Sequence, residues 1–138
     1  MADQVRKARY CYVVVRDRAG QGAAVLGGLA DAGVNLLGYL GFPAGGRRAQ
    51  LDFVTDRIGA VRRVARGLGL RVSAVKRCFL VQGEDRPGAV RRHVDRLAEA
   101  GISVTAAAGV TAGKRRYGMV LWVKPRLYAR AARVLRAR

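Results

Sequence analysis

The sequence is poor in acidic residues, histidine, cysteine and long apolar runs. Among 138 residues it has nine Asp and Glu against 27 Lys and Arg, one His and two Cys. No apolar run approaches the roughly 18 residues that a membrane-spanning helix needs. The first ten residues, MADQVRKARY, are not followed by the apolar stretch that a secretion signal carries. We therefore expect a cytoplasmic protein without membrane contact.

The few residues suited to metal binding or catalysis have no partners at useful spacing. Cys11 and Cys78 lie in apolar, strand-like runs without a second Cys or His nearby, which is typical of buried free thiols. His93 lies beside an apolar stripe on a predicted helix and is expected at the border of the core. The loops GFPAGGRR and GVTAGKRR lack the spacing of a phosphate-binding loop. We expect no metal, no cofactor and no catalytic residue, and hence not an enzyme.

The net charge of +18 is the strongest bias of composition. An Arg- and Ala-rich chain is typical of a GC-rich genome, which explains the preference for Arg over Lys. It does not explain the scarcity of acids, so contact with an anionic partner stays open.

Two segments of the chain repeat each other without a gap. RDRAGQGAAVLGGLADAGVNL begins at Arg16 and EDRPGAVRRHVDRLAEAGISV at Glu84, 68 residues later. The same shift pairs Gly20 with Gly88, and the register continues through the glycines and arginines of both following loops. A register kept over this length indicates duplication. We predict two modules, residues 1–75 and 76–138.

Each copy shows the same order of predicted elements. Apolar and β-branched runs predict strands, the apolar stripe of Val90, Val94, Leu97 and Ala98 predicts a helix, and glycine pairs predict hairpins. The expected strands are 10–15, 34–42, 51–55 and 70–75 in copy one and 79–81, 102–110 and 119–123 in copy two, with second helices at 59–67 and after Pro125. The fold class is therefore α+β, with two ferredoxin-like βαββαβ modules whose antiparallel sheets carry both helices on one face. Copy two lacks its last strand, which another subunit or the N-terminal arm would have to supply.

The sheet face away from the helices is expected to be apolar as well. If Cys11, Val13 and Leu51 face the helices, strand alternation turns another set of side chains the other way. This set is Tyr10, Tyr12, Val14, Leu37, Tyr39 and Val54 in copy one and Leu80, Ala107, Val120 and Trp122 in copy two. Because water seldom covers such a surface, we expect packing between copies or between subunits, and thus a homodimer or higher homo-oligomer.

The turn between first strand and first helix carries the clearest chemical signal. Such a turn directs free backbone N–H groups and the positive end of the helix dipole at one point, and Gly20 or Gly88 lets a carboxylate approach. Asp17 or Asp85 could then counter the ammonium group of an amino acid. The alternative is that both aspartates are only helix caps.

With its strand, DRAG or DRPG turn, helix, ADAGVNL or AEAGISV segment and hairpin, each copy resembles the ACT domain, and the whole chain resembles the small tandem ACT proteins. The resemblance implies a regulatory protein whose amino-acid ligand lies between modules, touching the turn of one and the start of the second strand of another. The implied ligand-binding residues are Asp17, Arg18, Ala19, Gly20, Asn35, Leu36, Asp85, Arg86, Pro87, Gly88, Ser103 and Val104. The chain departs from the family at Ala19, where Pro is frequent, and at Ser103, where Asn is frequent.

The predicted function is thus binding of an amino acid or similar metabolite without catalysis. The alternative is a nucleic-acid-associated protein that uses the second helix of each copy, where arginines have no acids near them. Its candidate residues are Arg62, Arg63, Arg66, Arg126, Arg130 and Arg133. Against it, the strands lack the aromatic platform with which RNA-binding folds of similar shape stack bases.

Overall fold

The computed structural model describes residues 3–138, which form two compact units. Arg9–Lys76 form the first, here called the N-unit. The second, here called the C-unit, consists of residues 3–8 and Arg77–Arg138. The protein is α+β, and its strand pairs β1–β3, β2–β3, β4–β6 and β5–β6 are antiparallel.

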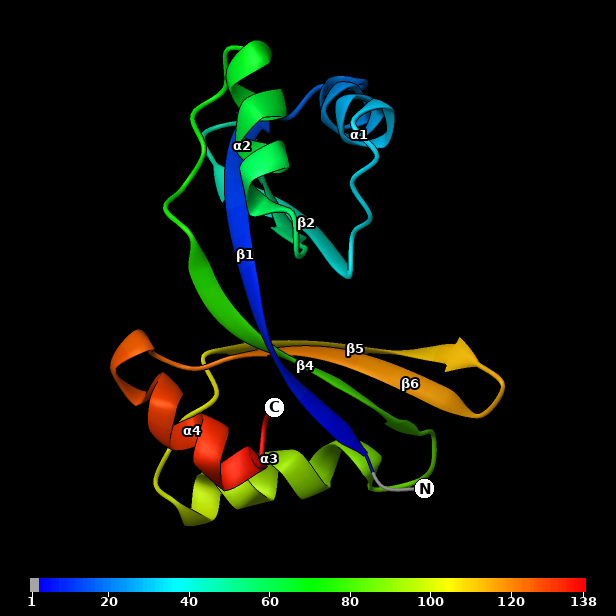
Figure 1. Cartoon of the computed structure of the whole chain (residues 1–138), viewed down its shortest axis with the longest axis vertical. Coiled ribbons are helices and arrows are strands. Elements are labelled where there is room, and N and C mark those ends of the chain that lie inside the picture. The colour runs from blue at the N-terminus through cyan, green and yellow to red at the C-terminus, as the bar shows by residue number, and fades with distance from the viewer. Residues whose placement is uncertain (1–2) are drawn as a thin grey trace. The chain divides into compact units, whose positions relative to one another are not determined.

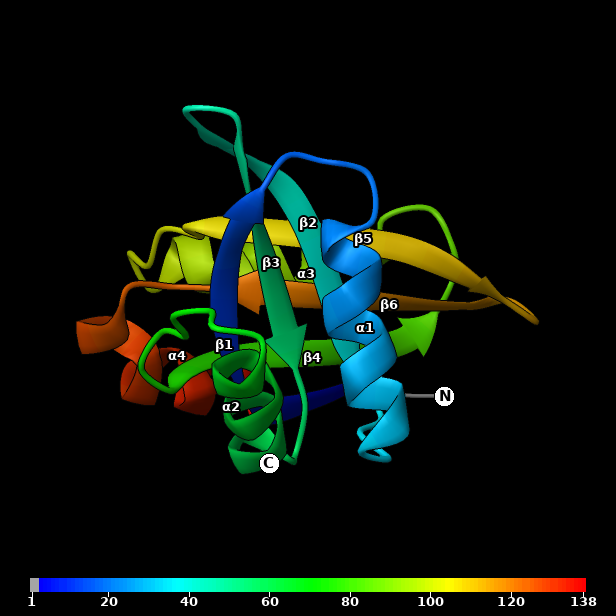
Figure 2. The same cartoon turned by 90° about the horizontal axis from the view of Figure 1, so that it is seen from above.

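The N-unit places two helices on one face of three strands (Figure 2). Its elements are the later part of β1 (Gln4–Arg16), α1 (Gln21–Asp31), β2 (Gly38–Gly45), β3 (Arg48–Val54) and α2 (Ile58–Gly67). β3 lies between β1 and β2. Alternation turns Cys11, Val13, Leu51 and Phe53 toward the helices, where they are at most 5% exposed. They pack with Val25 of α1 and other apolar helix residues in one core.

The C-unit repeats this arrangement, with α3 and α4 on one side of its strands (Figure 1). Its elements are β4 (Lys76–Glu84), α3 (Ala89–Glu99), β5 (Ala106–Gly113), β6 (Arg116–Trp122), the 3-10 turn η1 (Pro125–Leu127) and α4 (Tyr128–Leu135). Pro125 opens the last helical segment, as predicted. Tyr128 holds α4 on β4: its ring stacks on Phe79 at 4.4 Å and its hydroxyl donates to the Cys78 carbonyl at 2.8 Å.

The strand that copy two lacks is supplied by the N-terminal arm. The first part of β1 lies beside β4, and Val5, 8% exposed, belongs to the same core as Phe79 and Leu97. On its other side β1 exchanges backbone hydrogen bonds with Arg138: the Lys7 N–H donates to the Arg138 carbonyl at 2.9 Å and the Arg138 N–H to the Val5 carbonyl at 3.0 Å. The sequence left two sources for the missing strand, another subunit or the N-terminal arm, and in the structure the arm supplies it.

The predicted strand at 70–75 is wrong. Only Val72 bridges to Val13, and Ser73 uses its hydroxyl as well as its N–H to bind Tyr12. The hydrogen-bond ladder between this segment and β1 is interrupted, because the Tyr12 N–H donates to Ser73 Oγ instead of to a backbone carbonyl.

The second strand of each copy begins later than predicted, at Gly38 and Ala106. Gly33 and Gly101 end the preceding helices with positive φ, as expected. The N–H groups of Val34 and Ile102 then bind back to the helix carbonyls of Leu29 and Leu97 instead of joining the sheet.

Two side chains lie on the sheet face opposite to the predicted one. Tyr39 pairs with Phe53, and their ring centroids are 5.7 Å apart, so Tyr39 faces the helices. Ala107 pairs with Leu121, whose side chain is also in the helix-facing core. The sheet face of a side chain on the edge strand is set by the residue with which it pairs on the neighbouring strand. Alternation counted along the edge strand alone does not determine it.

The buried face of α3 also differs from the prediction. Ala89, His93 and Leu97 are buried, whereas Val90 is 43% exposed. The predicted stripe assumed that a polar ring stays at the border, but His93 is 2% exposed because it has a buried partner, described below.

Candidate ligand pocket at the Asp85 turn

The predicted turns have the same backbone geometry in both copies. Gly20 and Gly88 stand at the helix N-terminus with φ of 91° and 84°, a conformation that favours glycine. The N–H groups of Asp17 and Asp85 donate to the carbonyls that follow the hairpin glycines, those of Arg47 and Arg115, both at 2.8 Å. Each turn is therefore anchored to the neighbouring hairpin.

The interpretation of the two aspartates as helix caps is wrong. The N-cap residues are Gly20 and Gly88, and neither α1 nor α3 has a side-chain hydrogen bond at its cap. Asp17 and Asp85 are exposed. Because the first N–H groups of a helix have no intrahelical acceptor, those of α1 and α3 point toward the turn without a side-chain partner from the cap.

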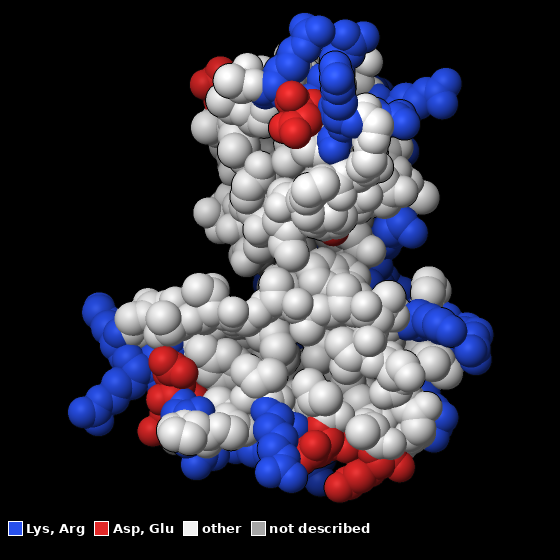
Figure 3. Space-filling view, turned by 180° about the vertical axis from the view of Figure 1, so that it is seen from behind, with Lys and Arg blue, Asp and Glu red and all other residues white. Residues whose placement is uncertain are grey.

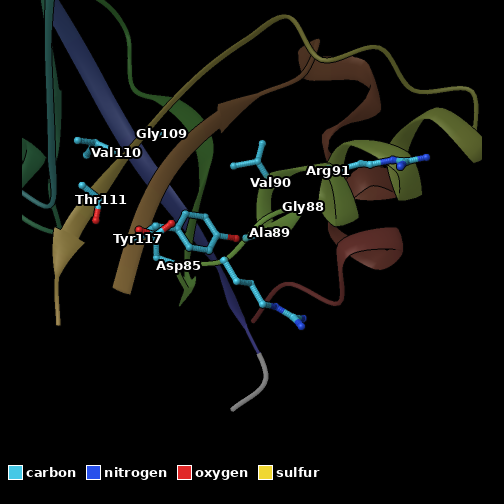
Figure 4. Close-up of a pocket in the computed structure, with 10 residues that line it drawn as sticks. Asp85, Gly88, Ala89, Val90, Arg91, Gly109, Val110, Thr111 and Tyr117 are labelled. Atoms are coloured by element: carbon cyan, nitrogen blue, oxygen red, sulfur yellow. The ribbon is translucent and has the colours of Figure 1, made fainter. Parts of the chain in front are cut away.

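A pocket of about 400 Å³ opens at the second of these turns. Figure 4 shows the start of α3 on one side, β5 on the other and the ring of Tyr117 between them. Its walls combine the predicted turn with the two strands of the adjacent hairpin. The lining residues are Asp85, Arg86, Gly88, Ala89, Val90, Arg91, Gly109, Val110, Thr111 and Tyr117.

Three of the predicted C-unit site residues line this pocket, namely Asp85, Arg86 and Gly88, whereas Pro87, Ser103 and Val104 do not. The last two follow the far end of α3, whose 11 residues span about 16 Å at 1.5 Å per residue. The structure thus separates the two halves of the predicted site within a unit.

The sequence missed the strand wall of the pocket. Gly109 falls within the predicted strand 102–110, whereas Thr111 and Tyr117 lie between the two strands predicted at 102–110 and 119–123. The register Glu84–Arg116 and the bond between Asp85 and Arg115 bring this hairpin beside the turn. The 68-residue spacing that pairs Gly41 with Gly109 was the available signal.

The charges around the pocket are not equivalent. Arg91 extends along α3 and its Nε lies 3.0 Å from Asp95 Oδ2 in an exposed ion pair. Asp85 and Arg86 are exposed at the turn itself. One carboxylate and one guanidinium therefore stand at the start of α3. They are complementary in charge to the ammonium and the carboxylate of a zwitterion.

Tyr117 connects the pocket to a buried cluster with Asp3 and His93. His93 Nε2 lies 2.7 Å from Asp3 Oδ2, and the Tyr117 hydroxyl donates to the same oxygen at 2.9 Å. Burial raises the pKa of Asp3, but the hydrogen bonds from His93 and Tyr117 and the charge of Arg92 outweigh it, so this pKa lies below its usual value. Burial and the Asp3 carboxylate raise the pKa of Tyr117 to about 12.

The residues around this cluster differ systematically from copy one. Gly83, His93 and Tyr117 stand where copy one has Val15, Val25 and Ala49. A β-carbon on Gly83 would overlap the Asp3 carboxylate. The second copy is thus shaped to receive the N-terminal arm.

In the N-unit, Asn35 and Leu36 follow the far end of α1, away from the Asp17–Gly20 turn. Asn35 is exposed, and its backbone carbonyl accepts a hydrogen bond from Thr55 Oγ1 at 2.9 Å. Its side chain lies apart from the turn of its own unit, and its part in ligand binding stays a prediction.

The arginines of the nucleic-acid alternative do not all point freely outward. Arg62 donates to the Ser73 carbonyl and Arg130 to the Ala100 carbonyl, whereas Arg63, Arg66, Arg126 and Arg133 are exposed. On the face in Figure 3 the basic side chains lie at the margins of each unit and leave a wide area without charge. Nucleic-acid binding stays a prediction.

Over residues 3–138, no group of His, Cys, Asp and Glu side chains has the arrangement of a metal site. Burial raises the pKa of the Cys11 thiol to about 11, which disfavours the nucleophilic thiolate at neutral pH. No helix in the same range combines the length and the apolar character needed to cross a bilayer.

No protein-family model and no curated protein matches the sequence. Solved structures match along nearly the whole chain. Protein BT0572 from Bacteroides thetaiotaomicron is 15% identical with a TM-score of 0.80, covering 96% of this chain and 88% of its own. The ligand-free regulatory subunit of aspartate kinase from Thermus thermophilus is 16% identical with a TM-score of 0.67, covering 98% and 93%. The subunit from Thermus flavus is 18% identical with a TM-score of 0.66, covering 98% and 94%. The resemblance to ACT-domain proteins is thereby confirmed at the level of the fold.

Proposed function

We propose that the protein is a non-catalytic regulator that binds an amino acid or similar small metabolite at interfaces between ACT-like modules. The observation that carries this proposal is the pocket at the Asp85 turn, where a repeated sequence motif, a helix N-terminus and a cavity coincide. The likeness in fold to regulatory subunits of aspartate kinase supports it.

The chemistry of the turn suits the carboxylate of an amino acid. The N–H groups of Val90 and Arg91 belong to the first turn of α3, and the helix dipole adds partial positive charge there. Gly88 has no side chain that would keep a ligand from these N–H groups. The position where its β-carbon would be lies in open space. We expect Asp85, which is exposed and lines the pocket, to pair with the ligand's ammonium group.

The separation of the site halves supports binding between modules. The turn and the Ser103–Val104 segment lie at opposite ends of α3 and cannot hold one small molecule together. We therefore propose that the N-unit and C-unit are two ferredoxin-like modules, and that a module of another subunit completes each site, so that the protein is a homodimer or higher homo-oligomer. Light scattering tests this last point, because a monomer at working concentration contradicts it.

A thermal-shift screen with each of the twenty L-amino acids tests the function. A ligand at 100 times its Kd stabilises the folded state by about 2.7 kcal/mol, which raises the Tm of a chain of this size by roughly 5–10 °C. Asp85→Ala should abolish the shift, because the ammonium loses its partner. Glu99→Ala, an exposed carboxylate at the other end of α3, is the matched control and should keep it. Flat curves for all twenty compounds at millimolar concentration would contradict the proposal.

A further inference from the structure

The two copies differ in the space between the first helical turn and the facing edge strand. In the C-unit this space is the pocket, with Val90 on α3 and Gly109 on β5 among its walls (Figure 4). The 68-residue shift pairs Val90 with Gly22 and Gly109 with Gly41 in the N-unit. The equivalent space of the N-unit is therefore bounded by Gly22 and Gly41.

The side chain of Tyr39 lies in that equivalent space. A β-carbon built on Gly22 would lie 3.8 Å from Tyr39 Oη, and one built on Gly41 would also lie 3.8 Å from it. The phenol thus stands between α1 and β2, the elements that correspond to the two walls of the pocket. Its ring packs against the ring of Phe53, which is completely buried, with 5.7 Å between the ring centroids.

The residues that admit Tyr39 are changed together in the second copy. Where the N-unit has Tyr39 with Gly22 opposite, the C-unit has Ala107 with Val90 opposite. The three atoms nearest to a β-carbon built on Gly109 belong to Met119 and the backbone of Gly118, so the contact that Tyr39 makes at Gly41 has no aromatic counterpart at Gly109. A tyrosine paired with a glycine fills the space, and an alanine paired with a valine leaves it open.

We infer that the two turns are not equivalent: the turn at Asp85 receives a ligand, and Tyr39 occupies the corresponding position at Asp17, so that each chain has one small-molecule site of this kind. The ligand assignment rests on the proposed function, whereas the occlusion by Tyr39 does not. The Asp17 turn keeps the backbone geometry of the motif, and the Tyr39 phenol stands in the equivalent space between α1 and β2.

Thiol accessibility tests the occlusion without any ligand. Gly41→Cys and Gly109→Cys place equivalent thiols in the two spaces, and the native Cys11 and Cys78 are both buried, which keeps the background low. With methyl methanethiosulfonate, Gly109→Cys should react rapidly and Gly41→Cys more slowly by roughly tenfold or more, since it must wait for local opening. Adding Tyr39→Ala to Gly41→Cys should restore the fast rate, and Tyr39→Phe should not. Equal rates at the two positions, or no gain with Tyr39→Ala, would overturn the occlusion.

Stoichiometry tests the ligand assignment, with the amino acid of largest thermal shift as the probe in equilibrium dialysis. We expect one molecule per chain for the unchanged protein, none for Ala107→Tyr combined with Val90→Gly, and one for Asp17→Ala. Two molecules per chain, or loss of binding in Asp17→Ala, would overturn the inference and leave the proposed function standing. Absence of binding by all twenty amino acids would overturn the proposed function and the ligand assignment, while the thiol rates still decide the occlusion.

Discussion

Replacing Asp3 by alanine is predicted to cost more stability than its place near the start of the chain suggests. The Asp3 side chain is 6% exposed, and its Oδ2 is the hydrogen-bond partner of both His93 and Tyr117. His93 Nδ1 has no partner within residues 3–138, so the loss of Asp3 would leave the whole imidazole unpaired. The substitution also removes a side-chain anchor next to β1, the strand that completes the C-unit.

The magnitude follows from the two groups left behind. A buried donor without an acceptor costs about 1–3 kcal/mol, and Asp3→Ala leaves two such donors, on His93 and Tyr117, for a total of about 2–6 kcal/mol. We therefore expect Asp3→Ala to lower the free energy of unfolding by about 2–6 kcal/mol, a large share of the roughly 5–15 kcal/mol of a typical domain. The corresponding fall in Tm is on the order of 10 °C.

Denaturant unfolding followed by tryptophan fluorescence measures this loss directly, because Trp122, the single tryptophan, lies in β6 of the C-unit. The control is Asp95→Ala, which removes an exposed ion pair to Arg91 and should cost less than about 1 kcal/mol. If the midpoint for Asp3→Ala falls no further than the midpoint for Asp95→Ala, the cluster does not anchor the arm and the reasoning is refuted.

Gly83→Ala should destabilise the protein by about as much as Asp3→Ala, because the new β-carbon would overlap the Asp3 carboxylate. The double variant should cost little more than either single variant, and additive losses in chemical denaturation would contradict this. In an alkaline titration followed by tyrosinate absorbance, one tyrosine should ionise near pH 12 and be missing in Tyr117→Phe; because its folded pKa is raised, its contribution to stability is full below about pH 10 and is lost as the pH rises toward 12. If the nucleic-acid alternative holds, binding of a random oligonucleotide, followed by fluorescence anisotropy, should weaken steeply with salt. The slope of log affinity against log salt concentration should fall by about 2 in the variant with Arg130→Glu and Arg133→Glu. An unchanged slope would exclude these two arginines from contact with the oligonucleotide.

The order of elements could be predicted because the duplication displays each signal twice. The DRxG turns, the glycines that end both first helices and the glycine hairpins recur in register, and all have the backbone that their residue types indicate. Strand ends were less predictable. Val34 and Ile102 are apolar and β-branched, but their N–H groups close the preceding helix, a use that composition does not reveal.

The parts of the site that sequence reasoning missed depend on contacts over long separations. Asp3 and His93 are 90 residues apart, and no local pattern connects them. The position of Tyr39 depends on strand register, which a single edge strand does not determine. The available signal was the set of differences between the copies, in which Gly83, His93 and Tyr117 replace apolar residues of copy one.

The sharing of β1 between the units has a consequence for how the chain folds during synthesis. The ribosome releases residues 3–8 before their partners in β4, α3 and β6, which emerge only after the N-unit is complete. The N-unit can therefore close while the arm is still unpaired, with Val5 and Ala8 exposed to water. A nascent chain stalled once the N-unit has emerged would present this apolar strand edge to chaperones or to the arm of a neighbouring chain.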